Sequence, residues 1–191
     1  YDGSRYKGFQ RLKDNENTIQ GKIESVLSKM TDEKIEIIGS GRTDMGVHAY
    51  NQIANFKTDS NLSVDKINDY LHRYLPEDIV VKKVEDVDLR FHSRYNAKKK
   101  VYLYKIYNEK HHDVFLRKYA NHIENSLDIE MMREASKYLI GEHDFTSFAS
   151  SKSEKKSNIR NIYSIDIKKN KGLVEIFVDG NGFLYDKVRI I

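Results

Sequence analysis

The sequence predicts an α+β fold of two ferredoxin-like split βαβ units that form one continuous, mainly antiparallel sheet with the helices on one face. Three observations support this class. Amphipathic helix patterns alternate with strand patterns, the order strand–helix–strand–strand–helix occurs twice, and 191 residues suffice for two small units. We expect an N-terminal α/β unit over residues 1–90 and a C-terminal α/β unit over residues 91–191.

The first half contains two expected helices and three expected strands. Thr18 can cap a helix over residues 18–30, and Ser63 can cap a second helix that Pro76 stops. Strands are expected at "EKIEIIGSG", "NQIANFKTD" and "DIVVKKVEDV", which carry apolar residues in alternation or in short runs. The opening strand of this half is nearly absent, so we expect the protein to continue before Tyr1.

The second half repeats this order. A strand is expected at "KVYLYKIYN", and Asp128 can cap the helix that follows. "NIYSIDIKK" and "GLVEIFVDG" are typical of a hairpin with its turn at residues 170–172. A last helix is expected to begin near Tyr185, and the chain ends within about two turns of that start. We therefore expect the protein to continue beyond Ile191.

Charge and aromatic content are compatible with RNA binding. The formal net charge is +4, the isoelectric point is about 9.0, and 13 tyrosines occur with no tryptophan. Many tyrosines adjoin Lys or Arg, as in "YDGSRYKGFQR" and "HSRYNAKKKVYLYKIYN", and aromatic faces can stack on bases while cations hold phosphates. Composition alone nevertheless favours a plainer interpretation, a Lys- and Tyr-rich surface whose tyrosines lie half in the core.

Several classes of protein are disfavoured. The chain has no cysteine, which excludes disulfides, thiolate nucleophiles and cysteine metal sites. Its seven histidines lack the i, i+4 spacing with an acidic third ligand, so no metal site is expected. No run of 18 apolar residues is present, and no leader pattern is recognisable. We expect a cytoplasmic protein without a membrane segment, metal or nucleotide cofactor.

"GSGRTDMGVHA", residues 39–49, is the candidate site. It directly follows an expected strand, and its glycines permit a tight turn that projects side chains beyond the sheet. Arg42 and Asp44 bring opposite charges into this turn, and His48 follows as a residue expected to support the glycine loop. Spacing alone favours a simpler role, in which Asp44 caps its own turn with help from Thr43.

Motifs along nearly the whole chain resemble those of the TruA-type tRNA pseudouridine synthases. "GRTDMGVHA" is similar to the family signature. The other similar segments occur in the family's order: "YDGSRYKGFQ", "NTIQGKIESVL", "LPEDI", "FHSRYNAKKKVYLYKIYN", "GEHDFTSF", "NIRNIYSIDI" and "GNGFLYDKVRII".

The resemblance implies the pseudouridine synthase fold and the isomerisation of uridine to pseudouridine in the tRNA anticodon stem-loop, at tRNA positions 38–40. The N1–C1′ bond breaks, the uracil turns, and C5 bonds to C1′, so no atom is gained or lost. Asp44 would be the catalytic aspartate and would begin either by adding covalently or by acting on the sugar. Tyr102 would stack on the extruded uracil, and Arg189 would pair with Asp44 and orient it.

The resemblance also implies a homodimer that binds tRNA. Base extrusion costs a few kcal/mol, and Arg42 could hold the opened backbone. Further RNA contacts are expected from the basic residues that adjoin tyrosines in two of the motifs: Arg5, Lys7, Lys98, Lys99 and Lys100.

Two other functions compete with the isomerase. One is a non-catalytic RNA-binding platform of two ferredoxin-like units, which gives no role to the Arg–Thr–Asp turn. The other is a metal-dependent hydrolase that uses Asp44 and His48. Binding and activity assays, the latter with and without EDTA, would separate the three.

Overall fold

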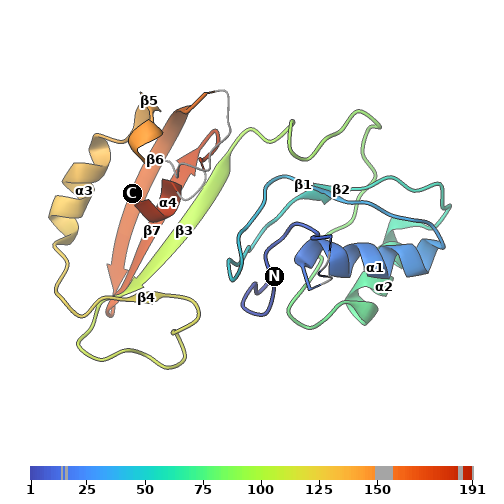
Figure 1. The fold of residues 1–191 in the computed structure, drawn as a ribbon, viewed down its shortest axis with the longest axis horizontal. Coiled ribbons are helices and arrows are strands. Elements are labelled where there is room, and N and C mark those ends of the chain that lie inside the picture. Colours follow the sequence, from blue (N-terminus) through green and yellow to red (C-terminus); the bar gives the residue numbers. More distant parts are fainter. Residues whose placement is uncertain (14, 16, 149–156, 185–186, 191) are drawn as a thin grey trace. The chain divides into compact units, whose positions relative to one another are not determined.

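The computed structural model of the chain describes residues 1–13, 15, 17–148, 157–184 and 187–190 (Figure 1). The chain divides into two compact units, Tyr1–Ala97 and Lys98–Ile191. The first carries two helices and a two-stranded sheet, and the second carries a five-stranded sheet with its own helices. Within the described ranges, no helix is long and apolar enough to cross a membrane.

Both helices of the first unit begin where the sequence predicts. α1 (Ile19–Thr31) follows Thr18, whose hydroxyl accepts a hydrogen bond from a backbone N–H of the first turn. α2 (Val64–Tyr74) follows Ser63, which caps it in the same way, and it ends before Pro76. The two caps satisfy N–H groups that have no partner inside a helix, so a local sequence signal fixes each start.

The strands of the first unit are shorter than predicted. β1 (Ile38–Gly39) and β2 (Ala54–Asn55) form an antiparallel pair of two residues each. The strand expected at residues 78–87 is wrong, because no regular strand is assigned there. Ile79 is buried and Val81 packs against the core, so the apolar pattern marks a covered extended segment. Such a pattern shows which side chains face the core, but it does not supply a partner strand.

One apolar cluster holds the first unit together. It joins both helices to the opening segment, defined here as residues 1–9, through Tyr6 and Phe9, which are each 3% exposed. The opening segment is thus anchored although it contains no helix or strand. The buried members of the cluster are Tyr6, Phe9, Ile19, Leu27, Ile35, Ile37, Ile67, Leu71 and Ile79.

The second unit is built on a sheet with the order β4-β3-β7-β6-β5. Neighbouring strands are antiparallel except β3 and β4, which are parallel. The two edge strands are short and polar and were not predicted. The bounds are β3 (Lys100–Tyr107), β4 (Asn121–His122), β5 (Gly141–Asp144), β6 (Ile159–Asn170) and β7 (Leu173–Gly180).

The hairpin between β6 and β7 confirms a prediction from the sequence. Its two-residue turn is Lys171–Gly172, and both residues have positive φ angles, 45° and 79°. Turns of this kind match the right-handed twist of the strands that they join. The turn lies within residues 170–172, as expected.

Two helices lie against this sheet. α3 (Ile129–Lys137) begins after Asp128, whose carboxylate accepts a hydrogen bond from the Met131 N–H, and it packs against β6. Ile129 and Met132 of α3 contact a cluster of strand residues that includes Ile167. The short helix α4 (Lys187–Ile190) lies against β3. Tyr185, the expected start of this helix, lies outside the described residues.

The α+β class and the mainly antiparallel sheet agree with the prediction, but the sheets differ from it in extent. The described strands of the first unit form a sheet of two strands, and those of the second unit form a sheet of five strands. β1 and β2 are too short to form a broad platform in the first unit. One continuous sheet shared by the two units stays a prediction.

Candidate active site

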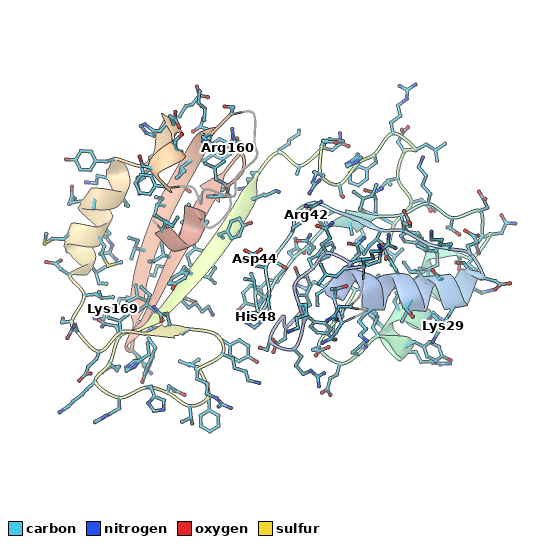
Figure 2. The ribbon with its side chains drawn as sticks, in the orientation of Figure 1. Lys29, Arg42, Asp44, His48, Arg160 and Lys169 are labelled. Atoms are coloured by element: carbon cyan, nitrogen blue, oxygen red, sulfur yellow. The ribbon has the colours of Figure 1, made fainter. Side chains whose placement is uncertain are left out.

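The loop over residues 39–49, called the aspartate loop below, leaves β1 and turns back toward β2. Gly46 has a φ angle of 78°, a conformation that side chains other than glycine rarely adopt. The N–H of Val47 donates to the carbonyl oxygen of Asp44 at 3.1 Å and closes the turn. Figure 2 shows Arg42, Asp44 and His48 along this loop.

Asp44 is half-buried, and its carboxylate is the candidate catalytic group. Among the described residues, no hydrogen bond or ion pair reaches this carboxylate, and the turn is closed instead by the backbone of Asp44 and Val47. The simpler role considered above, a side-chain cap of its own turn, has no counterpart in these hydrogen bonds. An acid held this way keeps both oxygens for groups outside the loop.

Arg42 is exposed, and in the described part of the chain its guanidinium has no hydrogen bond or acidic partner. His48, by contrast, is tied to the opening segment, since its Nδ1 lies 3.2 Å from the Gly3 nitrogen and 3.0 Å from Asp2 Oδ1. These contacts fit the predicted supporting role of His48, because they join it to residues 2 and 3. Among the described residues, no cluster of three or more His, Cys, Asp or Glu side chains could hold a metal ion, so the metal-dependent hydrolase gains no support.

Tyr102 is half-buried on β3, in register with Val178 of β7. Its ring meets the ring of Phe183 edge to face, with centroids 4.8 Å apart and an interplanar angle of 71°. Phe183 packs in turn on the apolar cluster that contains Val178 and Leu184. The Tyr102 ring is therefore fixed by an aromatic neighbour, which suits a platform for a planar group.

Arg189 belongs to α4, and its side chain lies outside the described residues. Because α4 lies against β3, the second unit brings the backbone of Arg189 and the strand of Tyr102 together. Asp44 belongs to the first unit. The pairing of Arg189 with Asp44 stays a prediction.

The basic residues expected to contact RNA differ in their partners. Lys7 and Lys98 are exposed, and Lys7 Nζ lies 3.9 Å from Met45 Sδ of the aspartate loop. Lys99 pairs with Asp179 at 2.8 Å. Lys100 is half-buried in β3.

Arg5 has a structural partner that the sequence does not reveal. Its Nε and Nη2 donate to Asp78 Oδ2 at 2.9 and 2.6 Å, and these hydrogen bonds raise the pKa of Arg5. The Tyr6 hydroxyl donates to Asp78 Oδ1 at 2.5 Å. Burial is the larger cause of a raised pKa for Tyr6, and this hydrogen bond is the second cause. Asp78 lies in the quoted motif "LPEDI", but 73 residues separate it from Arg5, and no local pattern predicts such a contact.

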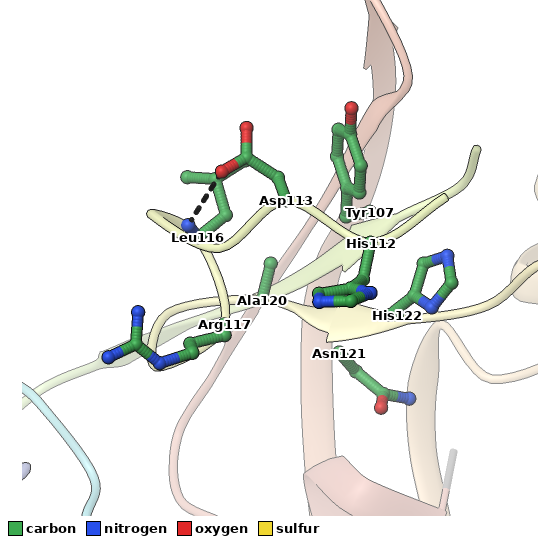
Figure 3. A pocket seen from close by; sticks show the side chains of 8 residues that line it. All are labelled: Tyr107, His112, Asp113, Leu116, Arg117, Ala120, Asn121 and His122. Carbon is green, nitrogen blue, oxygen red and sulfur yellow. Dashed lines mark hydrogen bonds between the residues drawn. The ribbon is translucent and has the colours of Figure 1, made fainter. Parts of the chain in front are cut away.

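A small cavity of about 180 Å³ lies within the loop between β3 and β4 (Figure 3). Asp113 Oδ1 accepts hydrogen bonds from the backbone N–H groups of Phe115 and Leu116, so the loop is braced by its own turn. None of the predicted site residues lines this cavity. Its lining residues are Tyr107, His112, Asp113, Leu116, Arg117, Ala120, Asn121 and His122.

Comparison with known proteins identifies the family. A family model described as tRNA pseudouridine synthase matches residues 1–96 and 135–191. These ranges include Arg42, Asp44 and Arg189, while Tyr102 falls in the gap between them.

Curated relatives align over the whole chain. A tRNA pseudouridine synthase A from Bacillus sp. (strain KSM-64) is 59% identical over 189 residues, which cover 99% of this chain and 78% of the relative. A tRNA pseudouridine synthase A 2 from Bacillus cereus (strain ZK / E33L) is 55% identical, and a tRNA pseudouridine synthase A 1 from Clostridium tetani (strain Massachusetts / E88) is 54% identical. Both of these alignments cover 100% of this chain and 78% of the relative. The family model matches most of the residues of this chain, and these relatives are more than half identical to it along nearly its whole length. The chain therefore belongs to the tRNA pseudouridine synthase family.

Proposed function

We propose that this chain isomerises uridine to pseudouridine in the anticodon stem-loop of tRNA, with Asp44 as the catalytic aspartate. The observation that carries the proposal is the state of Asp44. The residue is half-buried, its backbone closes a glycine turn, and its carboxylate accepts no hydrogen bond from the described residues. A carboxylate that only stabilised its turn would be engaged with the backbone of that turn.

The reaction requires few chemical groups. The N1–C1′ bond of uridine breaks, the uracil turns, C5 bonds to C1′, the proton on C5 is released and N1 gains a proton. Atoms balance without an external reactant, so one carboxylate that starts the cleavage and residues that hold the turning base are sufficient. This economy fits a chain whose sequence lacks cysteine.

The other candidate residues take roles that match their surroundings. Arg42 is exposed and has no acidic partner in the described part of the chain, which suits a group that holds the space left by an extruded base. Tyr102 has a ring fixed by Phe183 and would stack on the uracil. Arg189 would pair with Asp44 and keep the carboxylate charged.

The proposal includes the setting of the site. Two ferredoxin-like units would share the sheet in the assembled enzyme, two copies of the chain would bind one tRNA, and the protein would meet that tRNA in the cytoplasm. In the second unit, the neighbouring order of β3, β7 and β6 is compatible with a ferredoxin-like core. Arg42, Lys7 and Lys98 are the exposed cations proposed to hold the phosphates.

The direct test replaces Asp44. Asp44→Asn keeps the shape of the side chain and removes the nucleophilic charge, so we expect tritium release from tRNA labelled at uridine C5 to fall by at least about 10³-fold. Binding of the tRNA is expected to stay within about threefold. Wild-type turnover by Asp44→Asn would overturn the assignment. Binding without release by the unmodified full-length protein would favour the non-catalytic platform.

A further inference from the structure

The opening segment holds the aspartate loop on both sides of Asp44. The Phe9 N–H donates to the carbonyl oxygen of Thr43, the residue before Asp44, at 3.0 Å. The N–H of Gly46, two residues after Asp44, donates to the carbonyl oxygen of Tyr6 at 3.4 Å. The backbone that carries the carboxylate is therefore tied to one neighbouring segment at two points.

The same segment approaches the far end of the loop at van der Waals distance. A Cβ atom placed on Gly3 would lie 2.1 Å from the carbonyl oxygen of Val47, so no other residue fits there without moving the loop. Tyr1 and Ala49 exchange two backbone hydrogen bonds, at 2.8 and 3.1 Å. The opening segment thus contacts the loop from Thr43 to Ala49.

Two side chains add contacts to this backbone frame. The hydroxyl of Tyr1 forms a hydrogen bond with the hydroxyl of Thr43 at 2.8 Å. His48 Nδ1 can accept from the Gly3 N–H when it carries no proton, and it can donate to Asp2 when it carries one. The imidazole therefore stays joined to the opening segment in either state.

We propose that Tyr1 and His48 are positioning residues for Asp44. Tyr1 acts through Thr43 before the aspartate, and His48 acts through the turn after it. The inference rests on the proposed function, in which Asp44 must meet the ribose and base at reacting distance. A loop with no helix or strand of its own gains its precision from such supports, and a misplacement of about 1 Å can cost about 10² in rate.

The first test removes the hydroxyl pair. We expect Tyr1→Phe and Thr43→Val each to lower the single-turnover rate of pseudouridine formation by about tenfold in the full-length protein. The dissociation constant for tRNA is expected to change less than about twofold, because neither residue is proposed to contact RNA. The double variant should be no slower than the slower single variant, since both changes remove one bond.

Thr58→Val is the matched control. It replaces a hydroxyl that bonds to Glu33 at 3.0 Å elsewhere in the first unit, and we expect a wild-type rate. For His48, comparing two substitutions shows whether its polar atoms or only the volume of its ring support the loop. His48→Asn keeps polar atoms near the place of Nδ1 and should retain most of the rate, whereas His48→Phe keeps a ring without them and should lose about tenfold.

Asp44→Asn, measured in parallel, separates failure of the inference from failure of the function. If Asp44→Asn is active, the proposed function itself fails. If Asp44→Asn is inactive while Tyr1→Phe, Thr43→Val and His48→Phe react at the wild-type rate, the positioning inference is wrong and the function stands. A loss confined to tRNA affinity, with an unchanged single-turnover rate, would also overturn the inference.

Discussion

At the scale of single residues, the contact between Tyr6 and Asp78 links ionisation to folding. The Tyr6 side chain is almost fully buried, and its hydroxyl donates to Asp78. Burial and this hydrogen bond raise the pKa of Tyr6 above its ordinary value. Arg5 binds the other oxygen of the same carboxylate, so Asp78 anchors two consecutive residues of the opening segment.

This contact predicts a change in stability at alkaline pH. An unfolded tyrosine ionises at a pKa of about 10, whereas the folded protein holds the Tyr6 proton more tightly. The stabilisation is therefore complete below about pH 10 and is lost as the pH rises through the folded pKa. Tyr6→Phe should lower the free energy of unfolding by about 1–2 kcal/mol at pH 8.

Denaturant unfolding at increasing pH provides the measurement. Above pH 10 the difference between wild type and Tyr6→Phe should shrink, because only the wild type loses the contribution of this hydroxyl. Comparing the two proteins at each pH cancels the titration of the other tyrosines and lysines. A difference that stays constant up to about pH 11 would contradict the linkage.

At the scale of elements, α1 is joined to the chain entering β1 by the buried carboxylate of Glu24. Its Oε1 accepts from the Ile37 N–H at 2.9 Å and from Gln20 Nε2 at 2.8 Å. Its Oε2 accepts from Arg11 Nη1 at 2.9 Å. Since Glu24 is 5% exposed, these partners replace the water that the carboxylate loses on folding.

Removal of this carboxylate should be costly. Glu24→Ala leaves the Ile37 N–H and one face of Arg11 without acceptors, and we expect a loss of about 3–5 kcal/mol in the free energy of unfolding. Glu36→Ala is the matched control, because Glu36 contacts the same arginine at 3.3 Å from an exposed position. It should change stability by less than about 1 kcal/mol. Equal losses in the two variants would show that burial of Glu24 is unimportant.

The elements also show what a sequence can predict. Helix starts were predictable because Thr18, Ser63 and Asp128 act on N–H groups within their own first turn. The short edge strands β4 and β5 were missed, because their few polar residues pair with strands that are distant in sequence. Asp44 could be identified from its sequence motif. The contacts between its loop and the opening segment could not be predicted, because they join residues about 40 positions apart, and local propensity carries little information over that separation.

At the scale of the whole molecule, the net charge is +4, but the basic residues differ in whether an acidic side chain pairs with them. Lys99 is neutralised by Asp179, while its neighbour Lys98 is exposed and has no acidic partner in the described part of the chain. Phosphate binding releases counterions for each cation that contacts the nucleic acid. A cation that already holds a carboxylate contributes less, because it must first exchange that partner.

Substitutions of these two neighbouring lysines can therefore be compared to measure how much each contributes to tRNA binding. Lys98→Ala should reduce the magnitude of the slope of log affinity against log salt by about one, and it should weaken binding at low salt. Lys99→Ala should change the slope by less. Fluorescence anisotropy titrations at several salt concentrations would measure both. Affinity that does not depend on salt in the wild type would contradict phosphate contacts altogether.

The dependence of the aspartate loop on the opening segment, and of that segment on Asp78, also sets an order of events during synthesis. A nascent chain that has emerged only as far as β2 already contains the entire glycine turn. It lacks the carboxylate that fixes Arg5 and Tyr6 and the apolar face of α2. We therefore expect the loop to reach the conformation described here only after the ribosome has released the chain beyond residue 78.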